Sequence, residues 1–454
     1  MPTDPEEDPL EARPLLVLCA AAVAGGAATG LLGGAFRWSL QHADRMRLDL
    51  VHRAAGLPAG WLVPLVLAAL GAALARAIVR PVPLAAGSGV QEVEAVWREE
   101  AAPPSPAIIP AKFVGGVVAI GSGLVLGREG PTVHMGAAVA TLTGRVIRLP
   151  EEGVRVLQTA LGGAGLAVAF NAPMGGALFA MEEVARVFRV RLATVSLLGC
   201  GTAVACSRLL LGDRPDFLVV GLHPPPAPHL AVYALFGLAT GVLGVLYQRL
   251  ILGVLRVADR VRGVPPEVRA AVIGAMVGLL VWFAPLTVGG GDVVTQKTLS
   301  GGVGLLAAGG YLGARFLAGP ISYAAGTPGG LFAPLLAIGA LWGTIVHAGV
   351  HAAWPAFGDS AAPLVAVGMV AFFVVVVRAP LTGIVLISEM TATTSLLVPM
   401  ALAAAAAALV ATMFRSPPIY DSLRLRMLGD DGRAGARERD PDLPGEPPAA
   451  GDAG

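Results

Sequence analysis

The sequence has few charged residues: they make up only 14% of its 454 residues. A soluble domain carries about 25% charged residues, so the composition argues against a water-soluble fold. The net charge of +1 gives no electrostatic reason to expect a nucleic-acid partner. The three cysteines, Cys19, Cys200 and Cys206, lack the spacing of a metal site or a disulfide framework. We therefore expect no metal and no cofactor.

Aromatic residues are also scarce, at 6%, whereas hydrophobic residues reach 55% and glycines number 60. Small residues at helix interfaces let membrane helices approach each other closely. This composition predicts a protein that crosses a membrane several times.

The two ends of the chain differ in composition from its body. Residues 1–13 are acidic, unlike the basic start of a signal peptide, so we expect a retained N-terminal segment. Residues 429–454 are rich in Gly, Pro, Asp and Arg and have little to bury, which predicts a disordered tail. Residues 14–428 between them are expected to form one membrane domain.

Stretches without Asp, Glu, Lys or Arg mark the candidate spans, because a straight crossing needs about 20 apolar residues. Pro14–Phe36 and Met390–Phe414 fit one crossing each, and Phe316–Gly358 could hold two. Phe113–Gly127 and Ala379–Ser388 are too short. Short apolar pieces interrupted by Gly and Pro are typical of transporters with broken helices.

Three glycine-rich turns have the composition of helix starts at membrane depth. A broken helix is tolerated there only where it is buried or lines a cavity, and its free N–H groups attract an anion. Proline in the second and third turns suits the first turn of a following helix. Together the turns predict an anion pathway. They are Gly87-Ser88-Gly89-Val90-Gln91, Gly127-Arg128-Glu129-Gly130-Pro131 and Gly330-Leu331-Phe332-Ala333-Pro334.

Glu129 lies between two apolar stretches. A carboxylate at membrane depth costs about 2.5–3.5 kcal/mol, so it normally faces a cavity or has a partner. At a helix N-terminus it would take the place of an anion, and protonation would free that place. One glutamate could thus gate an anion pathway and carry a proton. An ion pair with Arg128 is the alternative, although adjacent helical residues do not face each other.

Other ionisable residues allow structural interpretations. Glu182 and Glu183 end an apolar run and precede Arg186, so they either form salt bridges at a helix end or relay protons. Glu389 is expected to brace a neighbouring helix. His134 lies in an apolar stretch without a carboxylate at ligand spacing, which favours a packing role.

The three turns resemble, in order, the three selectivity-filter segments of the CLC chloride channels and chloride/proton antiporters. Further segments resemble the family in the correct order: KFVGG at 112–116, AFNAPMGGALFAMEE at 169–183, RAPLTGIVLISEMT at 378–391 and PPIYDSL at 417–423. The resemblance covers residues 14–428. It implies an all-α membrane fold of two inverted repeats of broken and tilted helices, usually a homodimer. It also implies a multi-pass protein of a prokaryotic inner (plasma) membrane, with cytoplasmic termini and no nucleotide-sensing domains.

The resemblance also implies the residues of a chloride site. Ser88 and Tyr420 match the serine and tyrosine whose hydroxyls coordinate the central anion. The backbone amides of Leu331 and Phe332 would complete that site. Gln91 stands where the family usually has proline, and it adds an amide side chain near the inner mouth of the pathway.

Two glutamates match the family's proton-handling positions. Glu129 matches the external gating glutamate, and Glu183 matches the internal glutamate that passes protons in antiporters. Passive channels commonly lack the internal acid, so its presence favours chloride/proton antiport over a passive chloride channel, the nearer alternative. A distant alternative is an intramembrane serine protease that pairs Ser88 with a histidine base. Such an enzyme would not need the other two turns.

Overall fold

The structure, a computed structural model, describes residues 12–219, 222–261 and 263–439. Residues 1–11, most of the predicted N-terminal segment, lie outside the described residues. The first half of the chain forms α1 (Ala12–Ala54), α2 (Leu62–Ile78), α3 (Val90–Trp97), α4 (Ile108–Gly121), α5 (Glu129–Val146), α6 (Glu151–Phe170), α7 (Pro173–Phe179) and α8 (Val190–Leu211). The second half forms α9 (Leu230–Arg260), α10 (Pro266–Phe283), α11 (Asp292–Leu299), α12 (Leu305–Tyr323), α13 (Phe332–Ala353), α14 (Ala362–Val377), α15 (Pro380–Met390), α16 (Leu397–Met413) and α17 (Ile419–Arg439).

The described part of the chain is helical, and the lengths of its helices fit a membrane protein with full and partial crossings. Six stretches are long and apolar enough to cross a membrane, and five shorter apolar helices accompany them. The stretch Phe316–Gly358 contains the end of α12 and all of α13, which are separated by the third glycine-rich turn. The predicted mixture of long and short helices is confirmed.

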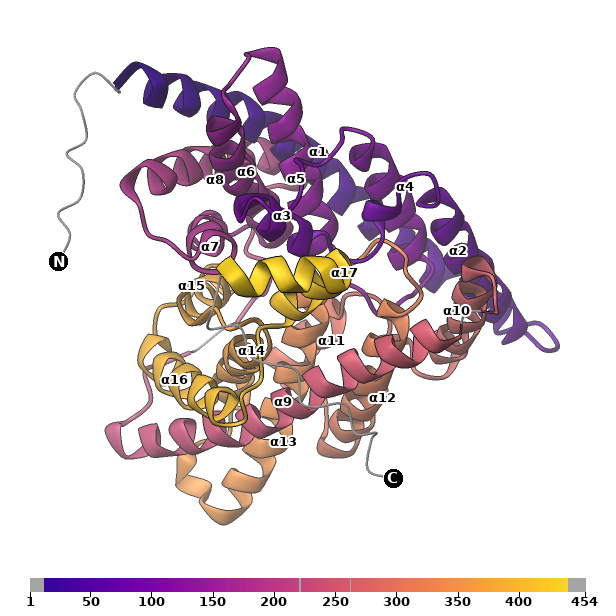
Figure 1. The fold of residues 1–454 in the computed structure, drawn as a ribbon. Coiled ribbons are helices and arrows are strands. Elements are labelled where there is room, and N and C mark those ends of the chain that lie inside the picture. The colour runs from indigo at the N-terminus through magenta and orange to yellow at the C-terminus, as the bar shows by residue number, and fades with distance from the viewer. Residues whose placement is uncertain (1–11, 220–221, 262, 440–454) are drawn as a thin grey trace, which may run out of the picture.

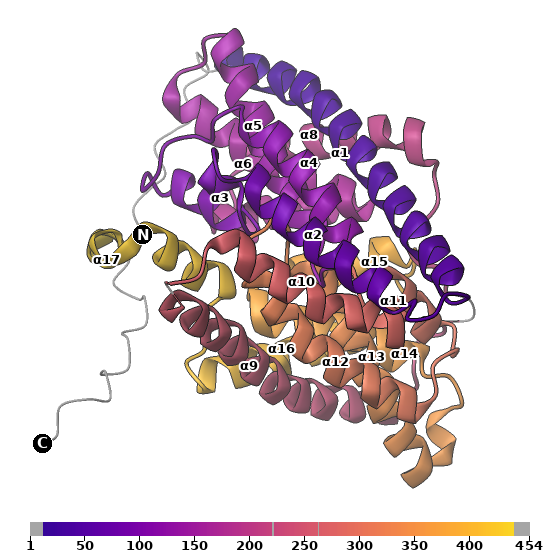
Figure 2. The ribbon, with the colours of Figure 1, turned by 90° about the vertical axis from the view of Figure 1, so that its right-hand side faces the viewer.

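Helices α1–α8 and α9–α16 form two repeats with matching motifs. Lys112-Phe113 in α4 precedes Gly127–Pro131, just as Arg315-Phe316 in α12 precedes Gly330–Pro334. In Figure 1 the indigo-to-magenta half lies above the orange-to-yellow half, with α7 meeting α15 and α2 meeting α10. Figure 2 shows α3 toward the side that carries α17 and its counterpart α11 toward the opposite side, as inverted repeats require.

Glycines let the central helices pack backbone against backbone. A Cβ atom built on Gly136 of α5 would lie 2.2 Å from the carbonyl oxygen of Leu161 in α6. At the equivalent place in the second repeat, a Cβ on Gly339 of α13 would lie 2.3 Å from the carbonyl oxygen of Gly368 in α14. Both contacts leave no room for a side chain, so these glycines hold the helix starts of α5 and α13 in place.

Helices α7 and α15 cap each other. The carboxylate of Glu182, just after α7, accepts hydrogen bonds from the first N–H groups of α15 at 2.9 and 2.6 Å. The carboxylate of Glu389, near the end of α15, accepts from the first N–H groups of α7 at 3.1 and 2.8 Å. The bracing role predicted for Glu389 is confirmed, and Glu182 caps a helix instead of forming a salt bridge.

Helix α17 extends into the segment that the sequence predicts to be a disordered tail. Its backbone continues to Arg439 after a non-helical break at Gly429, where φ is 76°, and the expected disorder of residues 429–454 stays a prediction. Residues 440–454 lie outside the described residues.

Replacing Gly339 by alanine should force α13 away from α14 and destabilise the protein by about 1–3 kcal/mol. Replacing Gly349, in the same helix, should have little effect, because no atom lies within 4 Å of the added Cβ. Thermal unfolding of both variants in detergent measures the difference. Equal melting temperatures for the two variants would contradict the close-packing argument.

Candidate anion pathway

The three glycine-rich turns meet at the centre of the molecule and are joined by backbone hydrogen bonds. Gly127 and Gly330 exchange two of them, at 2.8 and 2.7 Å. The N–H of Gly87 donates to the carbonyl oxygen of Thr327 at 3.0 Å, and the N–H of Gly329 donates back to Gly87 at 3.1 Å. Turns far apart in the sequence therefore form one unit.

Glu129 is the first residue of α5, and its side chain is completely buried. One carboxylate oxygen accepts a hydrogen bond from the N–H of Ala333 at 3.3 Å, and the N–H groups of Phe332 and of Glu129 itself also approach the carboxylate. A Cβ on Gly127 would lie 2.2 Å from both carboxylate oxygens. The carboxylate thus lies between the N-termini of α5 and α13, the position expected for an anion.

Ser88 and Tyr420 bring two hydroxyl groups to the same region. Both side chains are completely buried and their hydroxyls approach each other, but within the described residues neither makes a hydrogen bond of normal geometry. The Ser88 oxygen lies 2.6 Å from the position of a Cβ on Gly130. The Tyr420 ring lies near Ser88 and stacks on Phe332 with a centroid distance of 5.5 Å. Buried hydroxyls without a normal hydrogen bond are uncommon, so these two hydroxyls remain available to a ligand.

A buried lysine, for which the sequence predicted no role, holds the first glycine-rich turn in place. The ammonium group of Lys112 in α4 donates to the carbonyl oxygens of Gly87 and Ser88 at 2.7 and 2.9 Å. Its side chain is completely buried. The sequence could have predicted such a role, because a lone lysine in an apolar helix needs a polar partner.

His134 has a carboxylate partner, so the prediction of a packing role alone is wrong. Its Nε2 atom lies 2.9 Å from Glu92, and both side chains are buried. A Cβ on Gly89 would lie 2.2 Å from the Nδ1 atom of His134. Glu92 comes from α3 and His134 from α5, so no local spacing could reveal the pair.

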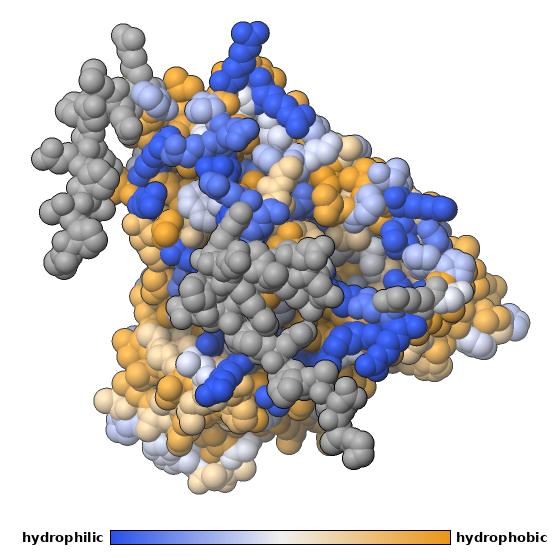
Figure 3. Space-filling view, in the orientation of Figure 1, coloured by the Kyte–Doolittle hydropathy of each residue, from blue (hydrophilic) through white to orange (hydrophobic). Residues whose placement is uncertain are grey.

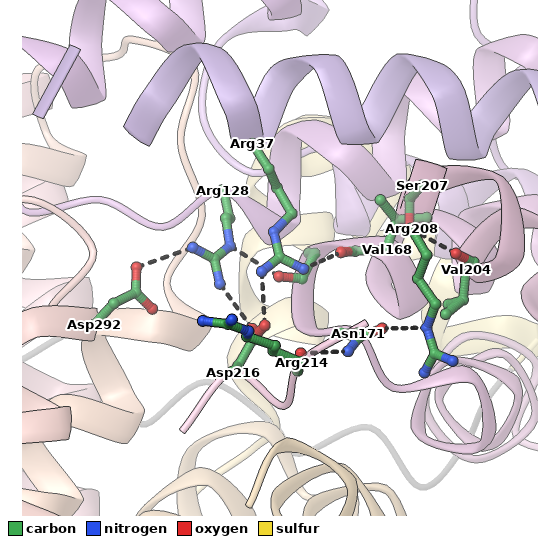
Figure 4. Close-up of polar contacts among 11 residues, drawn as sticks. Arg37, Arg128, Val168, Asn171, Val204, Ser207, Arg208, Arg214, Asp216 and Asp292 are labelled. Atoms are coloured by element: carbon green, nitrogen blue, oxygen red, sulfur yellow. Dashed lines mark hydrogen bonds and ion pairs between the residues drawn. The ribbon is translucent and has the colours of Figure 1, made fainter. Parts of the chain in front are cut away.

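Arg128 pairs with aspartates instead of its neighbour Glu129. Its guanidinium group lies 3.0 Å from Asp216 and 3.0 Å from Asp292. Arg37 of α1 contacts the same Asp216 at 2.6 Å. Figure 4 shows the two arginines converging on this carboxylate. The alternative of an Arg128–Glu129 ion pair is therefore wrong. We call the side of the molecule that carries Arg37, Arg128 and Asp216 the Arg128 side. The opposite side, which carries α17, is the α17 side.

Glu183 lies on the α17 side, in the π-helical turn Ala180–Ala185 that follows α7. Its side chain is buried beside those of Glu94 and Arg186. A cavity of about 310 Å³ reaches it from the surface. Single π turns of this kind occur frequently at functional sites. The cavity is lined by Glu182, Glu183, Arg186, Phe188, Arg378 and Pro418.

An ion-pair network attaches α17, and with it Tyr420, to the rest of the molecule. Asp421 lies 2.6 Å from Arg186 and 3.2 Å from Arg424. Arg424 also pairs with Glu100. Asp421 and Arg424 are buried, so the network positions the residue next to them firmly.

Comparison with known proteins identifies the family. A sequence model described as voltage gated chloride channel matches residues 71–412. The chain belongs to this family, the CLC family. Curated relatives of this CLC protein include the H(+)/Cl(-) exchange transporter ClcA of Citrobacter koseri, 34% identical over 95% of this chain and 93% of the relative. ClcA of Yersinia pseudotuberculosis is 34% identical over 93% of this chain and 90% of the relative.

Solved structures agree with the CLC fold. A slow cyanobacterial Cl-/H+ antiporter superposes with a TM-score of 0.87 at 29% identity, covering 92% of this chain and 99% of that one. A eukaryotic CLC transporter superposes with a TM-score of 0.78 at 22% identity over 90% of this chain and 74% of that one, which supports the fold alone. The predicted fold class, a polytopic all-α membrane protein, is confirmed.

This CLC protein is a transport protein and not an enzyme, as its family shows. The distant alternative of a serine protease also lacks the required geometry. Such an enzyme needs serine and histidine within hydrogen-bond reach. Among the described residues no hydrogen bond joins the Ser88 hydroxyl to a histidine, and His134 pairs with Glu92 instead.

Replacing Asp421 by asparagine should destabilise the attachment of α17 by about 3 kcal/mol or more, because buried cations lose their partner. Asp259→Asn provides the matched control. Asp259 pairs with Arg426 of α17 at an exposed position, and such pairs contribute less than about 1 kcal/mol. Limited proteolysis and thermal unfolding measure both variants. A similar small effect of the two substitutions would show that the buried network does not hold α17.

Proposed function

We propose that this CLC protein exchanges chloride for protons across the membrane. The observation that carries the proposal is the position of Glu129, whose carboxylate lies between the N-termini of α5 and α13. A carboxylate and a chloride ion compete for the same N–H groups. Protonation of Glu129 removes its charge and lets the side chain leave, so each proton taken up opens a place for an anion.

Chloride binds next to this position. The hydroxyls of Ser88 and Tyr420 donate to it, and the N–H groups of Leu331 and Phe332 at the start of α13 complete the site. Support comes from the two buried hydroxyls, which make no hydrogen bond of normal geometry among the described residues, and from the ring of Phe332 stacked on Tyr420. The relatives from Citrobacter koseri and Yersinia pseudotuberculosis are named for chloride exchange.

Protons reach Glu129 from the α17 side by way of Glu183. Its buried carboxyl group borders the open cavity of that side, so it can exchange protons with water. A passive channel of the same filter would not need this acid. The presence of Glu183, together with the antiporter among the similar structures, supports exchange over passive conduction.

The α17 side faces the cytoplasm. Arg426 of α17 pairs with Asp259 near the end of α9, so the connection between α9 and α10 lies on this side. The helix ends that flank this connection carry Arg256, Arg260 and Arg269, and such residues are enriched near the cytoplasmic ends of membrane spans. Figure 3 shows hydrophilic residues on the face around α17, with hydrophobic residues toward the periphery.

The protein resides in a bacterial inner membrane as a homodimer with one pathway per subunit. Support comes from the bacterial relatives and from the exposed apolar side chains of α8 and α16, such as Leu198 and Leu402. The mass of the detergent-solubilised protein, measured by light scattering, distinguishes a dimer from a monomer.

Vesicles that contain the purified protein and a chloride gradient provide the central test. Chloride efflux should drive protons uphill into the vesicles, recorded by chloride and pH electrodes in one bath. Glu129→Gln should allow chloride flux without proton movement, because the neutral side chain no longer titrates. Glu183→Gln should keep chloride flux and abolish proton movement.

Glu152→Gln is the matched control, because Glu152 is an exposed acid that pairs with Arg191, and its exchange should match that of the unmodified protein. Chloride flux without proton movement in the unmodified protein would establish a channel. Proton coupling that persists in Glu129→Gln would refute the gating role, and coupling that persists in Glu183→Gln would reassign the internal relay.

A further inference from the structure

The first three N–H groups of the first glycine-rich turn each have an acceptor within the described residues. The N–H of Gly87 donates to the main chain of Thr327. The N–H of Ser88 donates to the hydroxyl of Tyr323 at 3.3 Å. The N–H of Gly89 donates to the side-chain oxygen of Gln91 at 3.1 Å. Two of the three acceptors belong to side chains, which can rotate away.

The turn itself is held rigidly, so the side chains are its movable parts. Lys112 fixes the carbonyl oxygens of Gly87 and Ser88. Gly89 has a φ of +92° and packs against the ring of His134. Gln91, by contrast, is only half-buried, as is the neighbouring Gly87. An approaching ion can displace the carboxamide of Gln91 more easily than it can deform the turn.

This covered end of the turn lies on the α17 side, because α3, which begins at Val90, packs against α17. The position of a Cβ on Gly87 lies 3.1 Å from the Tyr323 hydroxyl and 3.9 Å from the amide nitrogen of Gln91. Ser88 is adjacent, and its buried hydroxyl makes no hydrogen bond of normal geometry among the described residues. An anion that leaves Ser88 toward the α17 side therefore meets these two side chains.

We propose that Gln91 is a barrier at the α17-side end of the anion path and limits how tightly and how fast chloride binds there. Its oxygen occupies the Gly89 N–H, a donor next to Ser88 that an anion arriving from this side meets. Chloride displaces the oxygen, and the rotated carboxamide can then offer its own N–H groups to the ion. Tyr323 covers the Ser88 N–H in the same way. The inference rests on the proposed function, because it assumes that chloride binds beside Ser88.

Two substitutions of Gln91 should change chloride affinity in opposite directions. Gln91→Ala frees the Gly89 N–H and should lower the chloride dissociation constant by about three- to tenfold. Gln91→Glu places a negative charge on that N–H and should raise the constant by about tenfold or more at neutral pH. Titration calorimetry of the detergent-solubilised protein with chloride measures both. A merely structural role would shift the two variants in the same direction.

Further variants keep the test independent of folding defects. Tyr323→Phe removes the second cover and should lower the chloride dissociation constant, as Gln91→Ala does. Gln296→Ala is the matched control, because the Gln296 side chain bonds the backbone of Leu218, away from the turn, and its affinity should stay unchanged. Bromide soaked into crystals of Gln91→Ala should give an anomalous peak within hydrogen-bond distance of the Gly89 nitrogen.

The unmodified protein separates the two hypotheses. If it binds no chloride, the proposed function fails, whatever Gln91 does. If it binds chloride but Gln91→Ala and Gln91→Glu leave the affinity unchanged or shift it in one direction, the barrier is refuted and the proposed function stands.

Discussion

The N–H groups in the first turn of a helix have no partner within that helix, and the interior of a membrane supplies no water to replace one. The starts of α5 and α13 meet at the centre of this protein, so something negative must lie between them. In the structure it is the carboxylate of Glu129. The surrounding structure fixes the two helix starts so that no backbone carbonyl takes the place of this carboxylate. Paired Gly127 and Gly330 align the two helix starts, and the glycine contacts behind them prevent α5 and α13 from sliding away.

The inverted repeat explains why two helix starts face one another, and single substitutions explain why they act differently. Glu129 and Phe332 occupy equivalent positions in the two repeats. One supplies the group that competes with an anion, and the other supplies a ring that stacks on Tyr420. Two cations have equivalent roles in the two repeats. Lys112 donates to the carbonyl oxygens of Gly87 and Ser88, and Arg315 donates to those of Gly289 and Gly290. The backbone scaffold is thus nearly symmetric, whereas the titratable Glu129 occurs in the first repeat alone and the stacking Phe332 in the second.

The glycine-rich turns and the placement of Glu129 could be predicted from the sequence, because both follow from residues close together along the chain. Glycine before an acid and proline after it describe a helix start wherever the helix lies. The role of Tyr420 came only with the family resemblance, since no local pattern places it beside Ser88. The partners of Arg128 and His134 were beyond sequence reasoning for the same reason. Asp216 and Glu92 reach them through the tertiary fold, and adjacent charges in the sequence even pointed to a wrong pair.

The arrangement of full charges gives a reason why the proposed pathway would hold its ion with backbone dipoles. On the Arg128 side, the positive charge of Arg128 is shared with two aspartates. At the first turn, Lys112 donates to carbonyl oxygens instead of facing the hydroxyl of Ser88. An unpaired ammonium or guanidinium group at the site would bind chloride strongly but release it slowly, and conduction needs binding weak enough to leave. N–H groups and hydroxyls attract the ion with partial charges. A carboxylate can displace the ion from such a site, so a single proton is enough to decide which of the two stays.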